Sequence, residues 1–232
     1  MNHIGIIGAM EEEVNILKNQ MKVNQIVKKA FMEFYQGTLS GKDVVIVRSG
    51  IGKVNAAVCT QMLVDLFQVE AVINTGVAGS LKNEINIGDI VISKDALNHD
   101  MDATGFGYAK GEIPRMEKSI FDSNETLIKL AKEVNEEVNS DISTFVGRVV
   151  SGDQFISSHD KKEELVNDFQ GFCTEMEGAA IAQAAYLNEI PYLVIRAISD
   201  KADNSAHMDY GEFEAKAIEH TVKLVTELLA RI

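Results

Sequence analysis

Acidic residues stand where predicted strands end, and carboxyl groups at such positions can act as general acids and bases. The acids are Glu11–Glu13 after Gly8, Asp153 after residues 145–150, Glu175 and Glu177 before residues 178–187, and Asp200 after residues 192–198. In open α/β sheets, ligands bind beyond the carboxyl ends of the strands. Several acids at such ends, with few bases around them, predict acid/base chemistry on a neutral or cationic ligand.

Each of these acids also has a structural interpretation. Three glutamates at the start of a helix complement its dipole, and Asp153 or Asp200 can cap the segment that follows it. Glu175 and Glu177 can be solvated acids of a first helical turn. No single acid decides between the two interpretations, but their joint placement at strand ends favours a site.

Other kinds of chemistry lack their motifs. Gly50-Ile51-Gly52 has no third glycine of a dinucleotide fingerprint, and Thr75–Gly79 does not end in the Gly-Lys-Ser/Thr of a phosphate loop. The five histidines form no pair at i,i+4 and no HExxH, and no GxSxG elbow is present. The residues therefore give no dinucleotide fingerprint or phosphate loop, and we expect no zinc site and no serine nucleophile elbow.

The elements that must position the acids alternate between strand and helix along the chain. Strands are predicted at residues 4–7, 34–39, 44–47, 71–74, 90–93, 145–150 and 192–198, and helices near residues 10–21, after Gly52, near 127–138, at 178–187 and from about Tyr210 to the end. This order predicts one α/β domain over residues 1–232 with a largely parallel sheet. Residues 99–116 form the one long irregular segment, which is typical of a lid or a subunit contact.

Composition excludes several classes of partner. The 232 residues carry 22 Lys plus Arg against 35 Asp plus Glu, a formal charge of −13, which disfavours nucleic acid and anionic membranes. Uncharged stretches are shorter than the ~20 apolar residues that span a bilayer. The first residues have no basic region before Glu11, so no signal peptide is predicted, and Cys59 and Cys173 form no CxxC. A reduced, cytoplasmic setting fits.

Six segments occur in an order that is specific as a set. They are Gly5–Val14, Ser49–Ala56, His99–Asp100 with Ala103–Thr104 and Phe106–Tyr108, Ser151–Asp153 with Phe155–Ile156, Glu175–Glu177, and Arg196–Asp200. With them the chain resembles the bacterial 5′-methylthioadenosine/S-adenosylhomocysteine nucleosidases of the purine nucleoside phosphorylase superfamily. The resemblance implies a single-domain, three-layer α/β/α fold of the nucleoside phosphorylase kind with a mixed, largely parallel central sheet, and a cytoplasmic homodimer. It also implies hydrolysis of the N-glycosidic bond of 5′-thio-adenosines without cofactor or metal, in nucleoside catabolism, methionine salvage and amino-acid biosynthesis. 5′-Deoxyadenosine is a further expected substrate.

The resemblance also implies roles for individual residues. Glu13 activates the attacking water, Asp200 assists protonation of adenine N7, and Glu177 holds the ribose hydroxyls. The remaining substrate contacts are Phe155 on the base, Met10, Ile51, Met176 and Tyr210 at the ribose and 5′ region, Val77, Ile156, Glu175, Arg196 and Ser199, and Ala103, Phe106 and Pro114 from the partner subunit. Leaving-group protonation requires that Asp200 be buried with a raised pKa, whereas Glu13 must be ionised when water attacks.

One position departs from the family. Val77 stands where the family usually has a serine that helps to hold the water, which puts the efficiency of hydrolysis in question more than the reaction type. Three alternatives stay open: an aminodeoxyfutalosine nucleosidase, a phosphate-dependent nucleoside phosphorylase, and a nucleoside-binding protein without turnover. A phosphorylase requires an anion site, whereas the chain has five arginines and presents acids in its N-terminal segment.

Overall fold

Short apolar runs become the strands of one mixed sheet in this computed structural model, which describes the backbone of residues 1–232 and all side chains except those of residues 207 and 208. The strands are β1 His3–Gly8, β2 Lys22–Lys29, β3 Met32–Leu39, β4 Lys42–Arg48, β5 Ala71–Ser80, β6 Ile90–Asn98, β7 Phe121–Asp122, β8 Thr144–Ser151, β9 Cys173–Glu175 and β10 Tyr192–Asp200. The helices are α1 Glu11–Gln20, α2 Lys53–Phe67, the 3₁₀ turn η1 Thr104–Phe106, α3 Glu125–Val138, α4 His159–Phe169, α5 Gly178–Leu187 and α6 Ala206–Arg231.

The sheet is partly closed on itself. Its strand order is β10-β6-β8-β9-β5-β1-β4-β3-β2, and β10 also pairs with β5, so that β5, β9, β8, β6 and β10 form a ring. Pairings β1–β4, β1–β5, β5–β10, β6–β8 and β8–β9 are parallel and the other five between described strands are antiparallel. The sheet is therefore mixed, as the expected fold class requires, and parallel and antiparallel pairings are equally frequent between the described strands.

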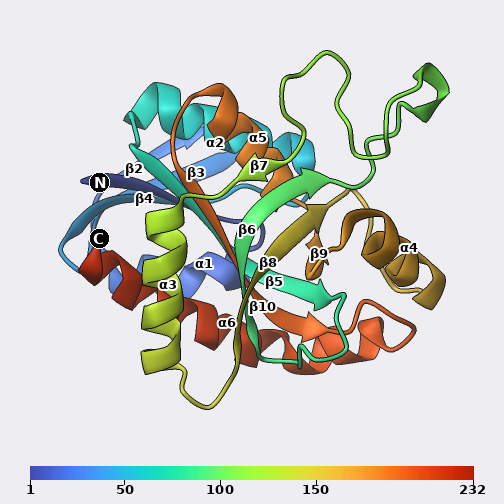
Figure 1. The fold of residues 1–232 in the computed structure, drawn as a ribbon. Coiled ribbons are helices and arrows are strands. Elements are labelled where there is room, and N and C mark those ends of the chain that lie inside the picture. The colour runs from blue at the N-terminus through green and yellow to red at the C-terminus, as the bar shows by residue number, and fades with distance from the viewer.

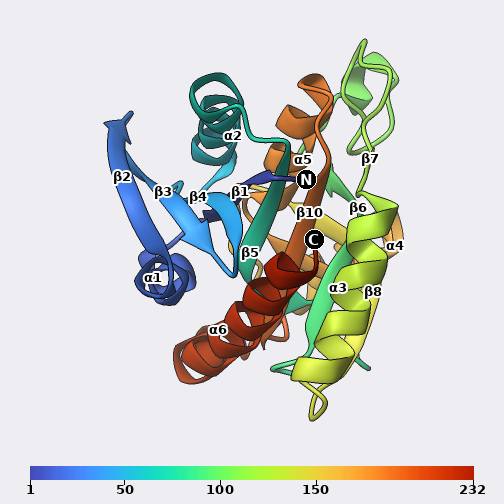
Figure 2. The ribbon, with the colours of Figure 1, turned by 90° about the vertical axis from the view of Figure 1, so that its left-hand side faces the viewer.

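Helices cover both faces of the sheet, as the three-layer expectation requires (Figures 1 and 2). α1, α3 and α6 share one apolar cluster with the sheet, in which Val14, Leu127 and Leu228 are fully or almost fully buried. α2 packs on the opposite face through Cys59 and Leu63, and α5 does so through its buried alanines. The two free cysteines are thus core residues. In the described part of the chain, no helix has the length and apolar character to cross a membrane.

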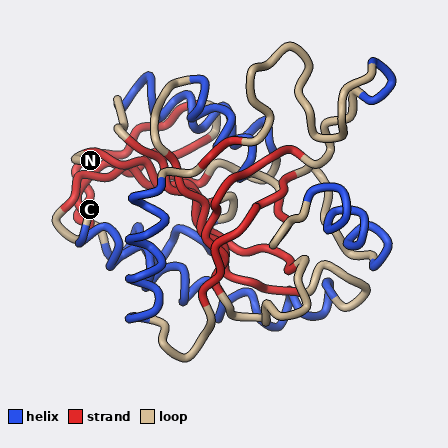
Figure 3. Tube along the Cα trace, in the orientation of Figure 1, coloured by secondary structure: helices blue, strands red, loops and turns tan.

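Some elements differ from the prediction. The side chains of β2 are almost all exposed, because β2 is an edge strand with one sheet neighbour, and so it shows no apolar alternation. α4 begins where Ser158 accepts the amide of Lys161, and α6 begins four residues before Tyr210. β10 continues through Asp200, so this acid is the last residue of the strand rather than a residue beyond it. Residues 99–116 form a projecting loop that contains only η1 (Figure 3).

Candidate active site

A cavity of about 380 Å³ opens where the carboxyl ends of β1, β5 and β10 meet β9 and the start of α5. Most of the expected site residues line it: Met10, Glu13, Ile51, Val77, Phe155, Glu175, Met176, Glu177, Ser199, Asp200 and Tyr210. Sequence reasoning missed four others, Ala9, Ala78, Gly79 and Thr174, each of which lies one or two positions from an expected residue in the chain. The acids at the strand ends are therefore brought together as the pattern predicts.

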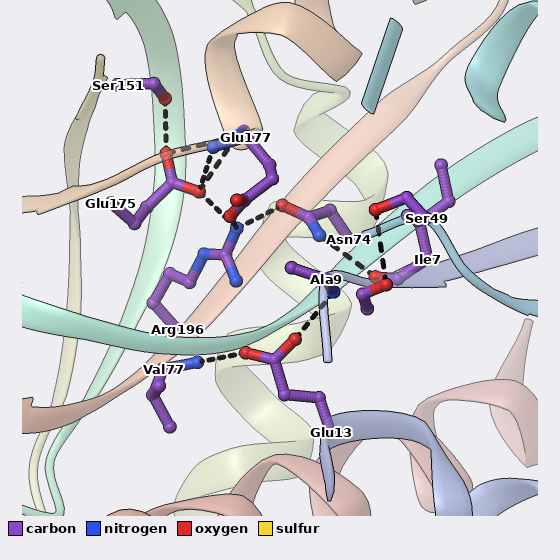
Figure 4. A network of polar contacts seen from close by, with 12 residues as sticks. Ile7, Ala9, Glu13, Ser49, Asn74, Val77, Ser151, Glu175, Glu177 and Arg196 are labelled. Carbon is purple, nitrogen blue, oxygen red and sulfur yellow. Dashed lines mark hydrogen bonds and ion pairs between the residues drawn. The ribbon is translucent and has the colours of Figure 1, made fainter. Parts of the chain in front are cut away.

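Arg196 organises the carboxylates from behind the cavity wall. It is fully buried on β10, and its Nη2 donates to Asn74 Oδ1 at 2.6 Å and to Glu175 Oε2 (Figure 4). Burial favours the neutral guanidine, but the charges of Glu175, Glu13 and Glu177 outweigh it and raise the pKa of Arg196. One permanent cation thus faces three acids, which fixes where negative charge can be held in the site.

Glu175 is held almost entirely by hydrogen bonds. Its Oε1 accepts from Ser151 Oγ and from the amide of Gly178 at 3.0 Å, while Oε2 accepts from the amides of Glu177 and Gly178 at 3.1 and 2.8 Å. The start of α5 therefore supplies the donors, as expected for an acid at a helix N-terminus. With its oxygens occupied in this way, Glu175 orients Arg196.

The carboxylate of Glu13 accepts three backbone amides, and its pKa is subject to opposing effects. Its Oε2 accepts the amides of Ala9 and Met10 at 2.6 and 3.0 Å, and its Oε1 accepts the amide of Val77 at 3.2 Å. Burial raises the pKa of Glu13, while Arg196 and these amides act in the opposite direction. Glu13 is 2% exposed, so burial opposes the ionised form that its expected role requires, while Arg196 and the three amides favour that form.

A glycine permits Glu13 and Arg196 to approach each other across β5. A Cβ at Gly76 would overlap both Arg196 Nη1 and Glu13 Oε1. The Thr75–Gly79 segment is therefore not a phosphate loop. Its glycine at position 76 leaves the space in which the side chains of Glu13 and Arg196 approach each other.

Glu177 precedes α5 and connects it with the start of α2. Its Oε1 accepts the amide of Gly52 at 2.8 Å, and its Oε2 lies 3.7 Å from Arg196 Nη2. Burial and then the charge of Glu175 raise the pKa of Glu177 to about 8. The acid cluster therefore keeps proton-binding capacity near neutral pH.

Among the residues that the structure describes, Asp200 forms no ion pair, and the cation coupled to it electrostatically is Lys162. Asp200 Oδ1 accepts the amide of Ala202 at 2.8 Å and its Oδ2 accepts from Ser199 Oγ at 2.9 Å, and both partners are uncharged. Burial is the largest effect on this carboxyl and raises its pKa; the charges of Asp209 and Asp203 add to the rise. The expected burial and the expected direction of the pKa shift are both confirmed.

The rest of the cavity is apolar and aromatic. Phe155 meets Tyr210 edge to face, with ring centroids 6.1 Å apart. The Tyr210 hydroxyl donates to Glu214 at 2.7 Å and lies 3.3 Å from Met10 Sδ. Val77 gives Glu13 its backbone amide but has no hydroxyl with which to hold a water.

Some expected contacts are not in the cavity. The Ile156 side chain is buried among Leu165, Phe169 and Val150, because the chain turns inward after the exposed Phe155. Arg196 acts on the acids from behind without lining the wall. Ala103, Phe106 and Pro114 lie on the loop after β6 and do not line the cavity of their own chain. Among the described residues, no group of three or more His, Cys, Asp and Glu side chains forms a metal site.

Comparisons with known proteins place this geometry in context. A sequence model described as the phosphorylase superfamily matches residues 3–230. The chain is 42% identical over 230 residues to the 5′-methylthioadenosine/S-adenosylhomocysteine nucleosidase of Staphylococcus aureus (strain JH9), covering 99% of this chain and 100% of the relative. The structure of the corresponding nucleosidase from Neisseria meningitidis, in complex with methylthio-immucillin-A, matches with a TM-score of 0.96 at 38% identity over 100% of both chains. Futalosine hydrolase of Helicobacter pylori matches with a TM-score of 0.94 at 32% identity, covering 100% of this chain and 98% of that chain.

Proposed function

The chain belongs to the phosphorylase superfamily, and we propose that its cavity hydrolyses the N-glycosidic bond of 5′-methylthioadenosine and S-adenosylhomocysteine, with 5′-deoxyadenosine as a further substrate. The products are adenine and the 5-substituted ribose, so the protein is a hydrolase of N-glycosyl bonds. The observation that carries the proposal is the pair of unlike carboxyl groups on one cavity. Asp200 is buried between uncharged partners, whereas Glu13 lies beside Arg196.

Departure of the base is the step assigned to Asp200. As the bond between C1′ and N9 breaks, its electron pair moves into the purine, and a proton from Asp200 to N7 makes the leaving group neutral adenine. A raised pKa keeps that proton available. Ser199 steadies the carboxyl through Oδ2, and Phe155 stacks on the base.

Attack by water is the step assigned to Glu13. The ribose becomes oxocarbenium-like as the base leaves, water adds to C1′, and its proton passes to Glu13. Glu177 accepts hydrogen bonds from the ribose hydroxyls, and the negative charge of its ionised form, with that of Glu175, stabilises the cationic ring more than the neutral substrate. Met10, Ile51, Met176, Val77 and Tyr210 provide the apolar wall that suits a 5′-thioalkyl group.

The cavity favours water over phosphate as the nucleophile. Its ionisable acids are Glu13, Glu175, Glu177 and Asp200, and its permanent cation, Arg196, is already engaged by Glu175. A phosphate dianion would be repelled by each of these acids that is ionised, including Glu13 in the form that accepts a proton from water. The futalosine hydrolase of Helicobacter pylori has the same fold, so aminodeoxyfutalosine hydrolysis is the second candidate, with the same base-leaving chemistry.

Adenine release by the purified protein tests the proposal directly. We expect 5′-methylthioadenosine to give adenine and free methylthioribose in phosphate-free buffer, at a rate that added phosphate does not increase. A sugar 1-phosphate formed only with phosphate would make the protein a phosphorylase. Release from aminodeoxyfutalosine alone would select the second candidate, and tight binding of adenosine analogues without release would select a binding protein.

The proposed active form is a homodimer. α2 and α5 pack side by side and expose apolar side chains, with Val54 74% and Leu187 63% exposed. A shallow cavity of about 280 Å³ lies between them and includes Met101 at the start of the projecting loop. Phe106 on that loop is 87% exposed. A second copy seated on this face would cover the apolar patch, and the partner subunit's Phe106 would then close the 5′ end of the cavity.

Oligomeric state and activity are expected to change together. Val54→Glu places a charge in the apolar face of α2 and is expected to give a monomer, with adenine release lowered on the order of 10-fold or more because the 5′ end stays open. Phe31→Ser is the matched control, since Phe31 is fully exposed at the β2–β3 hairpin and lies on neither helix. Analytical ultracentrifugation at assay concentration provides the measurement. A fully active monomer would contradict the shared site.

The same proposal gives the cellular setting. Cytoplasmic location agrees with two buried, unpaired thiols. Removal of by-product thionucleosides assigns the reaction to nucleoside catabolism, methionine salvage and amino-acid biosynthesis.

A further inference from the structure

Three charged residues outside the cavity meet at one point, although each comes from a different part of the chain. Lys53 Nζ donates to Asp100 Oδ1, and the backbone amide of Asp153 donates to Asp100 Oδ2 at 3.0 Å. Asp153 Oδ1 accepts the backbone amide of Lys53 at 2.9 Å. Each of the three residues therefore makes a hydrogen bond to each of the other two, through its side chain or its backbone amide. We call this closed set of contacts between Lys53, Asp100 and Asp153 the triangle.

The triangle supplies a cap that α2 lacks. The helix is preceded by Gly52, which offers no side-chain cap and has no acid in the first turn after it. Instead, Glu177 accepts the amide of Gly52 and Asp153 accepts the amide of Lys53. Gly52 has a φ of 97°, and a Cβ there would lie 3.1 Å from Asp153 Oδ1, so glycine is what lets this acid approach. Carboxylates at a helix start are stabilised by its free amides and its dipole.

Each residue of the triangle lies close in the sequence to a residue that lines the proposed site or is expected to complete it. Asp153 stands two residues before Phe155, and Lys53 follows Ile51 and Gly52 at the ribose side. Asp100 is the second residue of the projecting loop that carries Phe106. Displacement of any one of the three residues would therefore move Phe155, the base-stacking residue, relative to Ile51 at the ribose side.

We propose that Lys53, Asp100 and Asp153 form a positioning cluster that holds the base-stacking segment 153–156 against the start of α2, and so sets the affinity of the cavity for the purine. The assignment of the purine rests on the proposed function. None of the three residues lines the cavity, so they act through Phe155 and through the Gly52 contact with Glu177.

The ion pair between Lys53 and Asp100 is mostly shielded from solvent, unlike an ordinary surface salt bridge. The side chains of Lys53 and Asp100 are 21% and 16% exposed. Burial opposes ionisation of Asp100, but the bonds from Lys53 and from the Asp153 amide outweigh it and hold the pKa of Asp100 below its ordinary value. A carboxylate with both oxygens engaged in this way has little freedom to reorient.

Lys53→Met tests the cluster by removing the ammonium while keeping most of the side-chain stem. We expect KM for the thionucleoside and the dissociation constant of adenine, measured by calorimetry, to rise about 10-fold. We expect kcat to change by less than about 3-fold, because Glu13 and Asp200 are untouched. Lys53→Arg restores a cation and is expected to recover most of the affinity. Asp100→Asn retains an acceptor for the Asp153 amide and is expected to give an intermediate effect.

Lys132→Met is the matched control, since it removes an exposed lysine paired with Glu136 on α3. Unchanged KM and adenine affinity in Lys53→Met, or an equal loss in Lys53→Arg, would overturn the proposal. Hydrogen–deuterium exchange separates it from the proposed function. If the wild-type protein releases no adenine, faster exchange of residues 151–157 in Lys53→Met than in Lys132→Met still supports the cluster, and equal exchange overturns it.

Discussion

Asp200→Asn is expected to lower kcat for adenine release on the order of 10²–10⁴-fold, the usual contribution of a positioned general acid. Asparagine has nearly the same shape and cannot donate a carboxyl proton to N7. Its oxygen can still accept from Ala202, and its amide group can donate to Ser199 Oγ in place of the present bond. The fold and the affinity for substrate analogues are therefore expected to be retained, as single-turnover rates, thermal melting and calorimetry will show.

The matched control for this variant is Asp203→Asn. Asp203 lies three residues along and accepts from the amide of Ser205, with its side chain 32% exposed. We expect near-normal turnover for Asp203→Asn, since it does not line the cavity. Near-normal turnover in Asp200→Asn itself would refute the role in leaving-group protonation.

The pH dependence of the wild-type protein follows from the same group. Burial raises the pKa of Asp200, so the protonated form persists to higher pH than in an ordinary aspartate. Activity that depends on this proton falls as pH rises through the raised pKa. The alkaline limb of the kcat/KM profile is expected to be lost in Asp200→Asn. It is expected to persist in Asp203→Asn at a somewhat lower pH, because the charge of Asp203 contributes to the raised pKa of Asp200.

Glu13→Gln is the second large effect, with kcat lowered on the order of 10²–10⁴-fold because an amide cannot take a proton from water. This variant also disturbs structure. The carboxylate accepts from Ala9 and Met10 through one oxygen and from Val77 through the other. Glutamine turns one of these acceptors into a donor that faces a backbone amide, so the melting temperature is expected to fall as well.

Glu12→Gln separates the chemistry from the helix dipole. Glu12 stands in the same first turn of α1 but is exposed, so its replacement removes the dipole interaction and nothing from the cavity. We expect Glu12→Gln to retain activity. If both variants lost activity equally, Glu13 would be only a first-turn acid.

The acid limb of the pH profile belongs to Glu13. Its function requires the ionised form, and burial raises its pKa above the ordinary 4.5 despite Arg196 and three backbone amides. The value of kcat/KM is therefore expected to fall, as pH is lowered, at a higher pH than for an exposed glutamate. This limb is expected to be absent in Glu13→Gln and present in Glu12→Gln.

Local patterns were enough to find most elements and most cavity residues. The helices predicted near residues 10–21 and 127–138 depend on neighbours a few positions away: α1 buries Val14 and Leu17, and α3 begins where Asn124 accepts the amide of Leu127. β2 and β9 escaped the prediction because one is an exposed edge strand and the other has three residues. Asp153 was an open case between a cap and a site residue. It caps a helix, but the helix begins 100 residues earlier in the chain.

The sequence by itself determined that acids would gather at strand ends, because the period of apolar residues marks strands and the next polar residue marks their ends. Only the tertiary structure decided the hydrogen-bond partners, the burial and the neighbouring charges of each acid. The bonds from Val77 to Glu13 and from Arg196 to Asn74 join residues 64 and 122 positions apart. Such bonds depend on strand order and on the pairing of β10 with β5, which no local period encodes. Burial by those neighbours, with their charges, is also what separates the environment of Asp200 from that of Glu13.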